Sequence, residues 1–318
     1  MFVYGPVPSR RLERSLGVSI IPSKMCSYSC IYCQLGRTTI MKAERESPYV
    51  PEDIMKEIVS TAEKNAGNID YITFAGDGEP TLNKDLGYLI GRCNEELKIK
   101  TAVLTNGSML SLADVRSDLM KADAVNVTFS APNTAVFEKL HRPHKNIFFE
   151  KVREGVNKFA EDYSGRLMIE VMLVDKVNTD REMLISLRRI IDEIKGAEVL
   201  VMIPTRPPCE AWAVPPDEEK IAEAINILNG TGTTEMEIGE FGLAEFCGAE
   251  EAITEISARH PLRVSQAEMI ADKFGKKSVQ EMIAKKLVKS VLYRGERFII
   301  PMSLSHESVR SGKEKRDE

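Results

Sequence analysis

The residues best suited to chemistry are three cysteines that lie close together near the start of the chain. Cys26, Cys30 and Cys33 have a C-x3-C-x2-C spacing and follow the short apolar run 17–22. Three thiolates on one tight loop can bind three corners of a cubane [4Fe–4S] cluster. The fourth iron would then have no protein ligand and would be open to a small molecule. The loop is therefore a candidate cluster site.

Three other interpretations of these cysteines compete with the cluster. Structural zinc takes four ligands in two spaced pairs, whereas this loop has three thiols and no histidine nearby. A disulfide framework is typical of short secreted chains, but this chain has 318 residues and we expect no signal peptide. Chance clustering of core cysteines stays open, although the whole chain has only six. The spacing favours the cluster.

With Tyr32 just before the last cysteine, the loop resembles that of the radical S-adenosylmethionine superfamily. The resemblance implies that Cys26, Cys30 and Cys33 are the catalytic cluster ligands and that the open iron chelates S-adenosylmethionine. One electron from the cluster would cleave this cofactor to methionine and a 5′-deoxyadenosyl radical, which abstracts hydrogen from the substrate. The resemblance also implies that Tyr32 packs on the adenine.

The arginine-rich opening 4–14 carries a second, narrower resemblance. Its two prolines and three arginines predict a loop-like, solvated arm, or alternatively an anion clamp, because guanidinium groups bind carboxylate or phosphate bidentately. Segments 8–12 and 34–39 resemble the wyosine-type branch, named for the enzyme that builds the tricyclic base of tRNA. That enzyme has further cysteines for a second cluster, and this chain has none before Cys26. We therefore expect another substrate: another RNA, a peptide or a small metabolite.

A glycine–glutamate turn, Gly76-Asp77-Gly78-Glu79, follows the predicted strand 70–74. Glycines let backbone approach a ligand closely, and a carboxylate can accept hydrogen bonds from an ammonium group. As a bare turn it would only reverse the chain. It resembles the cofactor-binding glycine–glutamate motif of the superfamily, which implies that Glu79 binds the methionine amino group. Asp77 stands where many relatives have glycine, so its own contact is left open.

Two polar residues at later strand ends are further cofactor candidates. The resemblance implies that Asn106, after strand 100–105, and Ser130, at the end of strand 124–130, hydrogen-bond the ribose and the methionine carboxylate. Without the resemblance, Asn106 belongs to an ordinary turn. Glu170 interrupts the apolar strand 167–174. It either points to solvent past a helix or faces the barrel interior near cofactor or substrate.

The remaining titratable residues give weaker signals. His141 is expected in a solvated loop beyond the fourth strand, with no metal-binding spacing around it. Cys93 and Cys247 are expected to be structural. Cys209 follows the sixth strand and could face substrate, perhaps as a hydrogen-atom donor.

Strands and helices alternate through most of the chain. The strands are expected near 17–22, at 70–74, 100–105, 124–130, 167–174 and 198–203, and the helices at 51–64, 84–97, 110–121, 149–163, 181–194 and 216–228. Six such units imply parallel strands with right-handed crossovers and predict an α/β fold, a partial (β/α)6 radical-SAM barrel open on one side. A doubly wound open sheet is the alternative. In either fold, the motifs would meet at the carboxyl ends of the strands.

The C-terminal sixth has a different pattern. We predict a barrel domain over 1–230, a linker over 231–248 with a strand at 235–239, a winged-helix-like domain over 249–302 and a disordered tail over 303–318. The 249–302 segment has ten Lys/Arg and seven Asp/Glu. Its basic residues could contact phosphates of RNA or DNA. Alternatively, they form a solvated face of a module for protein contact or substrate presentation.

Composition limits the remaining possibilities. The net charge of −5 argues against a wholly basic nucleic-acid coat, and no apolar run approaches the ~20 residues of a membrane span. Six cysteines fit a reducing cytoplasm. We therefore predict a cytoplasmic radical SAM iron–sulfur oxidoreductase, reduced by a protein such as flavodoxin or ferredoxin. The alternative is an iron–sulfur redox sensor that binds DNA, which would leave the six α/β units unexplained.

Overall fold

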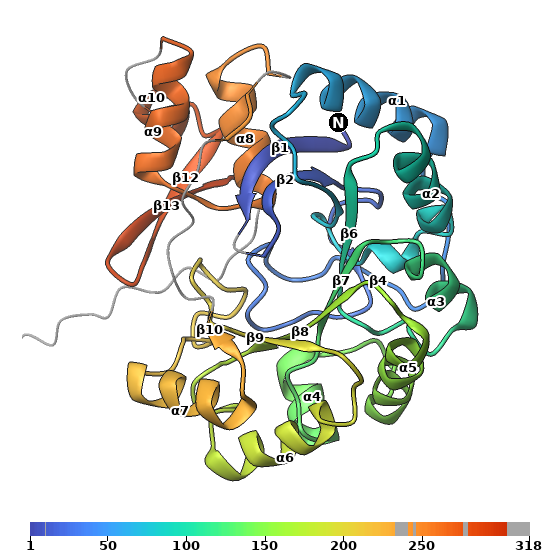
Figure 1. The fold of residues 1–318 in the computed structure, drawn as a ribbon. Coiled ribbons are helices and arrows are strands. Elements are labelled where there is room, and N and C mark those ends of the chain that lie inside the picture. The colour runs from blue at the N-terminus through green and yellow to red at the C-terminus, as the bar shows by residue number, and fades with distance from the viewer. Residues whose placement is uncertain (10, 233–240, 244–245, 276–278, 304–318) are drawn as a thin grey trace, which may run out of the picture.

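The main body of the protein is one twisted sheet flanked by helices. The computed structural model describes residues 1–9, 11–232, 241–243, 246–275 and 279–303 (Figure 1). In their order across the eight-stranded sheet, the strands are β1 (Val3–Ser9), β2 (Glu13–Val18), β5 (Tyr71–Phe74), β6 (Lys100–Thr105), β7 (Ala124–Thr128), β8 (Arg166–Met172), β9 (Glu198–Met202) and β10 (Thr231–Gly232). All neighbours from β2 to β10 pair in parallel, and β1 pairs antiparallel with β2.

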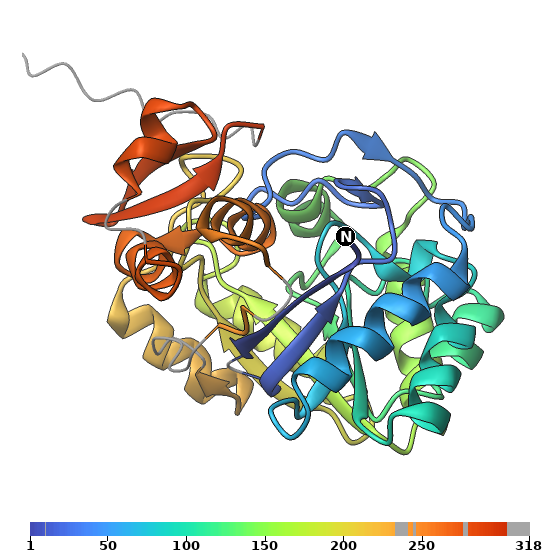
Figure 2. The same ribbon diagram turned by 90° about the horizontal axis from the view of Figure 1, so that it is seen from above.

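The strand order distinguishes the two predicted α/β folds. From β2 to β10, each strand lies beside the next parallel strand in sequence, and the order never reverses. A doubly wound sheet requires a reversal, because its helices cover both faces. Here the connecting helices follow one another around the outside of the sheet (Figures 1 and 2). They are α1 (Pro51–Lys64), α2 (Leu86–Glu96), α3 (Ala113–Leu119), α5 (Phe149–Asp162), α6 (Arg181–Ile191) and α7 (Glu218–Leu228). Helix α4 (Thr134–His141) lies instead beside the loop that carries the cysteines.

Helix α1 shows how local sequence fixes an element. Pro51 stands in the first turn, where its missing N–H costs nothing, and two acidic residues there oppose the positive end of the helix dipole. Ile54, Met55 and Ile58 are buried at helical spacing, so one stripe of the helix packs on the sheet. The helix has the predicted bounds.

The N-terminal segment is a buried strand, so the prediction of a solvated, loop-like arm was wrong. Prolines are tolerated in β1 because it is an edge strand of the sheet. At the turn into β2, the Ser9 hydroxyl accepts a hydrogen bond from the Leu12 N–H at 3.2 Å. Leu12 is 1% exposed and packs with Ala102, Ala124 and other residues near the amino ends of the strands. The β1–β2 connection thus closes that end of the barrel.

The segment after β7 was also predicted wrongly, as a loop. Residues Thr134–His141 form helix α4, whose first turn is capped by Asn133, with its side chain accepting from the Val136 N–H at 3.0 Å. Arg142 ends the helix in the left-handed region, with φ +46°. His141 is therefore a buried helical residue rather than a solvated loop residue.

The C-terminal unit packs beside β1 (Figure 1). Its elements are α8 (Ala249–Arg259), β11 (Leu262–Arg263), α9 (Val264–Lys273), α10 (Gln280–Ala284), β12 (Val288–Tyr293) and β13 (Glu296–Pro301), with an antiparallel sheet in the order β11-β13-β12. Tyr4 and Val7 of β1 share one apolar cluster with Ile253, Ile256 and other residues of this unit. Three helices and the β12–β13 hairpin therefore lie in the segment that was predicted to be a winged-helix-like domain, together with the short strand β11. The winged-helix interpretation stays a prediction.

Several predictions for the segments 231–248 and 303–318 fall outside the described residues, and one is changed by the structure. The strand at 235–239 and nearly all of the tail lie outside them, and the segment predicted as a linker begins with β10, which pairs with β9.

No helix within the described ranges is both long and apolar enough to cross a membrane.

Candidate functional site

One cavity brings most of the predicted site residues together. It has a volume of about 370 Å³ and extends from the carboxyl ends of the strands into the barrel interior. Its lining includes Cys26, Cys30, Tyr32, Cys33, Gly76, Asp77, Gly78, Glu79 and Asn106. The cysteine loop, the glycine–glutamate turn and Asn106 therefore line the same cavity, although Cys26 and Asn106 are 80 positions apart. The barrel prediction required this.

The cysteine loop is held in place by backbone hydrogen bonds at both ends. The short strands β3 (Met25–Cys26) and β4 (Ile40–Met41) pair in parallel and join its two ends. The end of α4 then binds its middle: the N–H of Ile31 donates to the carbonyl of Leu140 at 3.0 Å, and that of Ser29 to the carbonyl of His141 at 2.9 Å. The missed helix α4 is thus part of the scaffold of the loop.

The three thiols are suited to bind a metal cluster. All three are free, half-buried and line the cavity. Burial raises the pKa of Cys26 to about 12 and also raises the pKa of Cys30 and Cys33, so these thiols stay protonated unless a cation binds them. The Asn106 amide and the Tyr28 N–H each lie 3.5 Å from the Cys26 sulfur, as donors for a thiolate.

The donor set can be compared with what a single metal ion and a cubane require. No group of three or more His, Cys, Asp or Glu side chains within the described ranges is gathered as around one metal ion. In a cubane each thiolate binds a different iron, so its ligands lie farther apart than around one zinc. Three free thiols that line one cavity are the donor set that such a cluster needs from the protein.

His141 lies against the cysteine loop. Its Nδ1 is 3.4 Å from the Cys30 sulfur and 3.3 Å from the Tyr32 hydroxyl. Burial lowers the pKa of His141 to about 3, so the ring is neutral. A neutral imidazole beside a ligand sulfur can orient it without adding charge. This contact was not predicted, because the sequence analysis placed His141 in a solvated loop rather than in helix α4.

The glycine turn packs against the start of the cysteine loop. A Cβ on Gly78 would lie 1.9 Å from the carbonyl oxygen of Met25, so no other residue fits there. The Lys24 N–H donates to the carbonyl of Asp77 at 2.6 Å, and the Glu79 N–H to that of Met25 at 3.1 Å. The sequence had predicted that these glycines allow approach to a ligand. At Gly78 the close approach is to the protein's own backbone.

Glu79 connects the ends of β5 and β6. It is 2% exposed, and its carboxylate accepts from the Thr81 hydroxyl at 2.6 Å, the Thr81 N–H at 3.1 Å, the Thr105 hydroxyl at 2.6 Å and the Asn106 N–H at 2.7 Å. Burial raises the pKa of Glu79, although these hydrogen bonds oppose the shift. A ligand ammonium group bound here would share the carboxylate with these protein donors.

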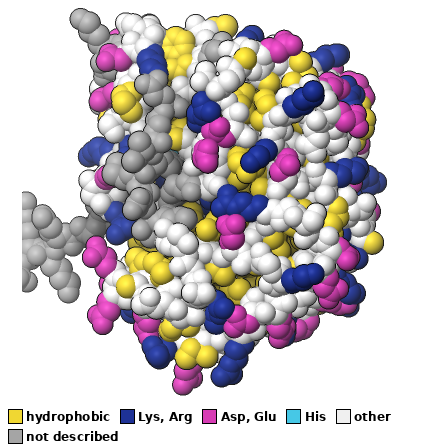
Figure 3. All heavy atoms as spheres, viewed as in Figure 1, with side chains coloured by type: hydrophobic (Ala, Val, Ile, Leu, Met, Phe, Trp, Pro, Cys, Tyr) yellow, Lys and Arg dark blue, Asp and Glu magenta, His cyan; other side chains and the backbone are white. Residues whose placement is uncertain are grey.

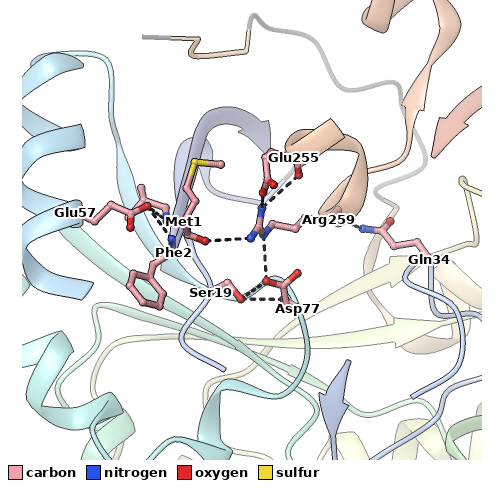
Figure 4. A network of polar contacts seen from close by, with 9 residues as sticks. Met1, Phe2, Ser19, Gln34, Glu57, Asp77, Glu255 and Arg259 are labelled. Atoms are coloured by element: carbon pink, nitrogen blue, oxygen red, sulfur yellow. Dashed lines mark hydrogen bonds and ion pairs between the residues drawn. The ribbon is translucent and has the colours of Figure 1, made fainter. Parts of the chain in front are cut away.

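Asp77 belongs to a network that reaches the C-terminal unit (Figure 4). Its Oδ2 accepts from the Ser19 hydroxyl at 2.6 Å and from Nε of Arg259 at 3.2 Å. Arg259 ends α8 and also pairs with Glu255 at 2.8 Å. The Arg259 carbonyl accepts from the side chain of Gln34, in the cysteine loop, at 2.8 Å. Within the described chain, the contacts of Asp77 are therefore made with protein groups.

The other predicted residues have different positions. The Asn106 side chain donates to the Ser27 hydroxyl at 2.9 Å and faces the cysteine loop. Ser130 is 1% exposed, accepts from the Met172 N–H at 2.9 Å and is not among the residues that line the cavity. Cys209 is also buried outside the lining. Cys93 is buried and Cys247 is exposed.

Glu170 faces the barrel interior, which resolves the alternatives left open by its sequence position. It lines the cavity, forms an ion pair with Arg11 and accepts from the Asn126 side chain at 2.9 Å. The contribution of Arg11 was not predicted beyond a general anion clamp. Arg14, the other described arginine of that segment, pairs instead with Asp70 at 2.8 Å.

The outer surface is mixed in charge. Lys and Arg side chains alternate with Asp and Glu over the face in Figure 3. In the C-terminal unit, Lys285 pairs with Glu250 at 2.7 Å. Two basic residues of the 249–302 segment, Lys276 and Lys277, lie outside the described residues.

Comparison with known proteins agrees with this geometry. The model of the radical SAM superfamily matches residues 20–190, so the chain belongs to that superfamily, whose members are enzymes. Membership implies S-adenosylmethionine and a [4Fe–4S] cluster.

Similar proteins cover most of the chain. UPF0026 protein MJ1312 of Methanocaldococcus jannaschii is 35% identical over 291 residues, which are 90% of this chain and 89% of that protein. Two solved structures share the fold: a radical SAM methyltransferase from Sphaerobacter thermophilus (TM-score 0.52, 18% identity, 70% of this chain and 65% of that one) and TYW1 with a lysine-pyruvate adduct bound (TM-score 0.53, 15% identity, 69% and 74%). This chain thus spans slightly less than two thirds of the methyltransferase.

Proposed function

We propose that this protein is a radical SAM enzyme that holds a [4Fe–4S] cluster on Cys26, Cys30 and Cys33 and reductively cleaves S-adenosylmethionine. The observation that carries the proposal is the shared cavity: three free thiols and the glycine–glutamate turn line it together, inside a barrel of the radical SAM superfamily. The reaction on the substrate begins with abstraction of a hydrogen atom.

When bound, the cluster and S-adenosylmethionine would supply one electron and a hydrogen-abstracting radical. The chain's own residues bind and orient them. The side chains of His141 and Asn106 lie beside the sulfurs of Cys30 and Cys26 and would orient these ligands. Glu79 would accept from the cofactor amino group, and Tyr32 would pack on the adenine. Asn106 and Ser130 would hydrogen-bond the ribose and the methionine carboxylate. Asn106 lines the cavity, and Ser130 is not among the lining residues, so its side chain would have to turn toward the cofactor.

The finer assignments rest on sequence resemblance. We assign the chain to the wyosine-type branch because of segments 8–12 and 34–39, with a substrate that is another RNA, a peptide or a small metabolite. A flavodoxin or ferredoxin would supply the electron. The domain division is the one predicted from the sequence, with a barrel over 1–230 and a winged-helix-like domain over 249–302. The winged-helix-like domain contacts RNA or protein. The alternative of a DNA-binding regulator has no support among the similar proteins.

The test is formation of 5′-deoxyadenosine by anaerobically reconstituted protein given dithionite and S-adenosylmethionine. We expect slow formation by the wild type and none by Cys30→Ala. Cys247→Ala is the matched control, because Cys247 is exposed and lies outside the cavity, and it should behave like the wild type. Equal formation by Cys30→Ala and the wild type would refute the assignment of the cluster ligands.

A further inference from the structure

Lys24 stands two positions before Cys26, and its backbone is fixed on both sides. Its N–H donates to the carbonyl of Asp77 at 2.6 Å, and its carbonyl accepts from the N–H groups of Thr39 and Ile40 at 3.3 and 3.2 Å. Its φ of +61° lies in the left-handed region, which residues other than glycine seldom adopt. The glycine turn and the end of the cysteine loop thus hold Lys24 in one place.

The side chain of Lys24 is buried without a counter-charge. Lys24 is 9% exposed and lines the same cavity as the three cysteines. Within the described chain, its ammonium group makes no hydrogen bond and no ion pair. Burial lowers its pKa, and the charged groups that act on this pKa are Cys33, Cys209 and Lys289, none of them a carboxylate. Because a lysine is seldom buried without a partner, the site calls for an anion that no carboxylate of the described chain supplies.

The cysteine loop can supply that anion. The charge of Cys33 opposes the effect of burial on the pKa of Lys24. In return, burial raises the pKa of Cys33, and a hydrogen bond from the Leu35 backbone and the ammonium group of Lys24 oppose that shift. Among the described residues, no basic side chain acts in this way on Cys26 or Cys30. Lys24 is therefore the cation within electrostatic reach of the thiols, and it acts on the last of them.

The charge of a bound cluster makes this position consequential. Three thiolates outweigh the positive charge of an oxidised cubane, and each added electron makes the site more negative. A cation nearby stabilises the reduced form more than the oxidised form. This interaction needs no contact, because charges interact over several ångströms in a site of low dielectric.

We propose that Lys24 is the counter-charge of the cluster and raises its reduction potential, so that one electron from a low-potential donor reduces [4Fe–4S]²⁺ to [4Fe–4S]⁺ more readily. Lys24 acts on the cluster through its charge and takes no part in the reaction on the substrate. The inference rests on the proposed function, since it concerns the cluster that Cys26, Cys30 and Cys33 would hold.

A redox titration of the anaerobically reconstituted full chain tests the proposal. Titanium(III) citrate serves as the reductant, and the EPR signal of the reduced cluster gives the potential without S-adenosylmethionine or substrate. We expect Lys24→Met, which keeps the side-chain length and removes the charge, to make reduction about tenfold less favourable. For a one-electron couple this is a shift of about 59 mV to more negative potential.

Two matched variants separate charge from other effects. Lys24→Arg keeps the charge and should have nearly the potential of the wild type. Lys56→Met removes a charge from α1, where the side chain is 78% exposed and pairs with Asp53, and should leave the potential unchanged. A cluster-loaded Lys24→Met with the potential of the wild type would overturn the proposal. So would an equal shift in Lys24→Arg, since charge would then not be the cause.

Iron content covers the case in which Lys24→Met forms no cluster. Lys24→Gln then serves as a second neutral variant. Loss of iron in both neutral variants but not in Lys24→Arg would support the need for the charge, whereas loss in all three would contradict it. Failure of the wild type to form a reducible cluster would instead refute the proposed function, so the two failures are distinct.

Discussion

Arg259 connects the C-terminal unit to the glycine turn, and replacing it by leucine should strongly destabilise the protein. Its side chain is 9% exposed and pairs with Asp77, whose side chain is 12% exposed. It also donates to the carbonyl of Met1 at 3.3 Å (Figure 4). Its guanidinium carbon lies 5.1 Å from the centre of the Tyr4 ring. Arg259→Leu would leave the Asp77 carboxylate buried without its counter-charge.

The magnitude follows from this burial. Removing one member of a buried ion pair costs about 3–5 kcal/mol, and we expect the lower end, about 3 kcal/mol, because Asp77 keeps its hydrogen bond from Ser19. Urea unfolding, followed by Trp212 fluorescence and circular dichroism, measures the loss. Arg297→Leu is the control: this arginine is exposed in the same unit, and its replacement should change the free energy of unfolding by less than about 0.5 kcal/mol.

A double-mutant cycle with Asp77→Asn isolates the pair. Because the two side chains are in contact, the cycle should give a coupling free energy of about 1.5–3 kcal/mol. A coupling below about 0.5 kcal/mol would refute the reasoning, since it would mean that Arg259 acts through Glu255 or packing alone.

Two further predictions concern the turn and the surface. Gly78→Ala should abolish iron binding by the reconstituted protein, because the new Cβ would lie 1.9 Å from the Met25 carbonyl oxygen. Gly91→Ala is the control and should bind iron normally, since a Cβ there meets open space. Equal iron content in the two variants would contradict the packing of the turn. Asp70 has its pKa lowered to about 2 by the hydrogen bonds from Arg14. A lowered pKa in the folded state stabilises the protein above the unfolded pKa of about 3.9, so Asp70→Asn should destabilise it near neutral pH, and the difference should fade as the pH falls toward 2. A pH-independent difference in thermal unfolding would exclude this origin.

The sequence predicted elements whose signals are local. Helix α1 has a first-turn proline and an amphipathic stripe, and it has the predicted bounds. Strand β1 was missed because its prolines are tolerated only at a sheet edge, and its burial by the C-terminal unit involves residues far away in sequence. Helix α4 was missed although its Asn133 cap was visible in the sequence.

The candidate site divides in the same way. The cysteine loop and the glycine–glutamate turn were recognisable as motifs, and the barrel brings them together. The partners that fix them were not recognisable, because Arg259 and Asp77 are 182 positions apart. Ser130 was predicted at a strand end near the cofactor, but its hydroxyl bonds the neighbouring strand, outside the cavity lining. The strand before Ser130 was predicted to reach residue 130, whereas β7 ends at Thr128. Side-chain direction at such a position depends on the neighbouring strand.

The measurement that tests the central claim most directly is the EPR spectrum of the reduced, reconstituted protein with and without S-adenosylmethionine. Three protein thiolates leave one iron of the cluster open, so we predict that S-adenosylmethionine changes the spectrum of the wild type. Cys93→Ala should show the same change, since Cys93 is buried in α2 away from the cavity. A reduced cluster whose spectrum is unaltered by S-adenosylmethionine would contradict the open iron and the proposed cleavage that depends on it.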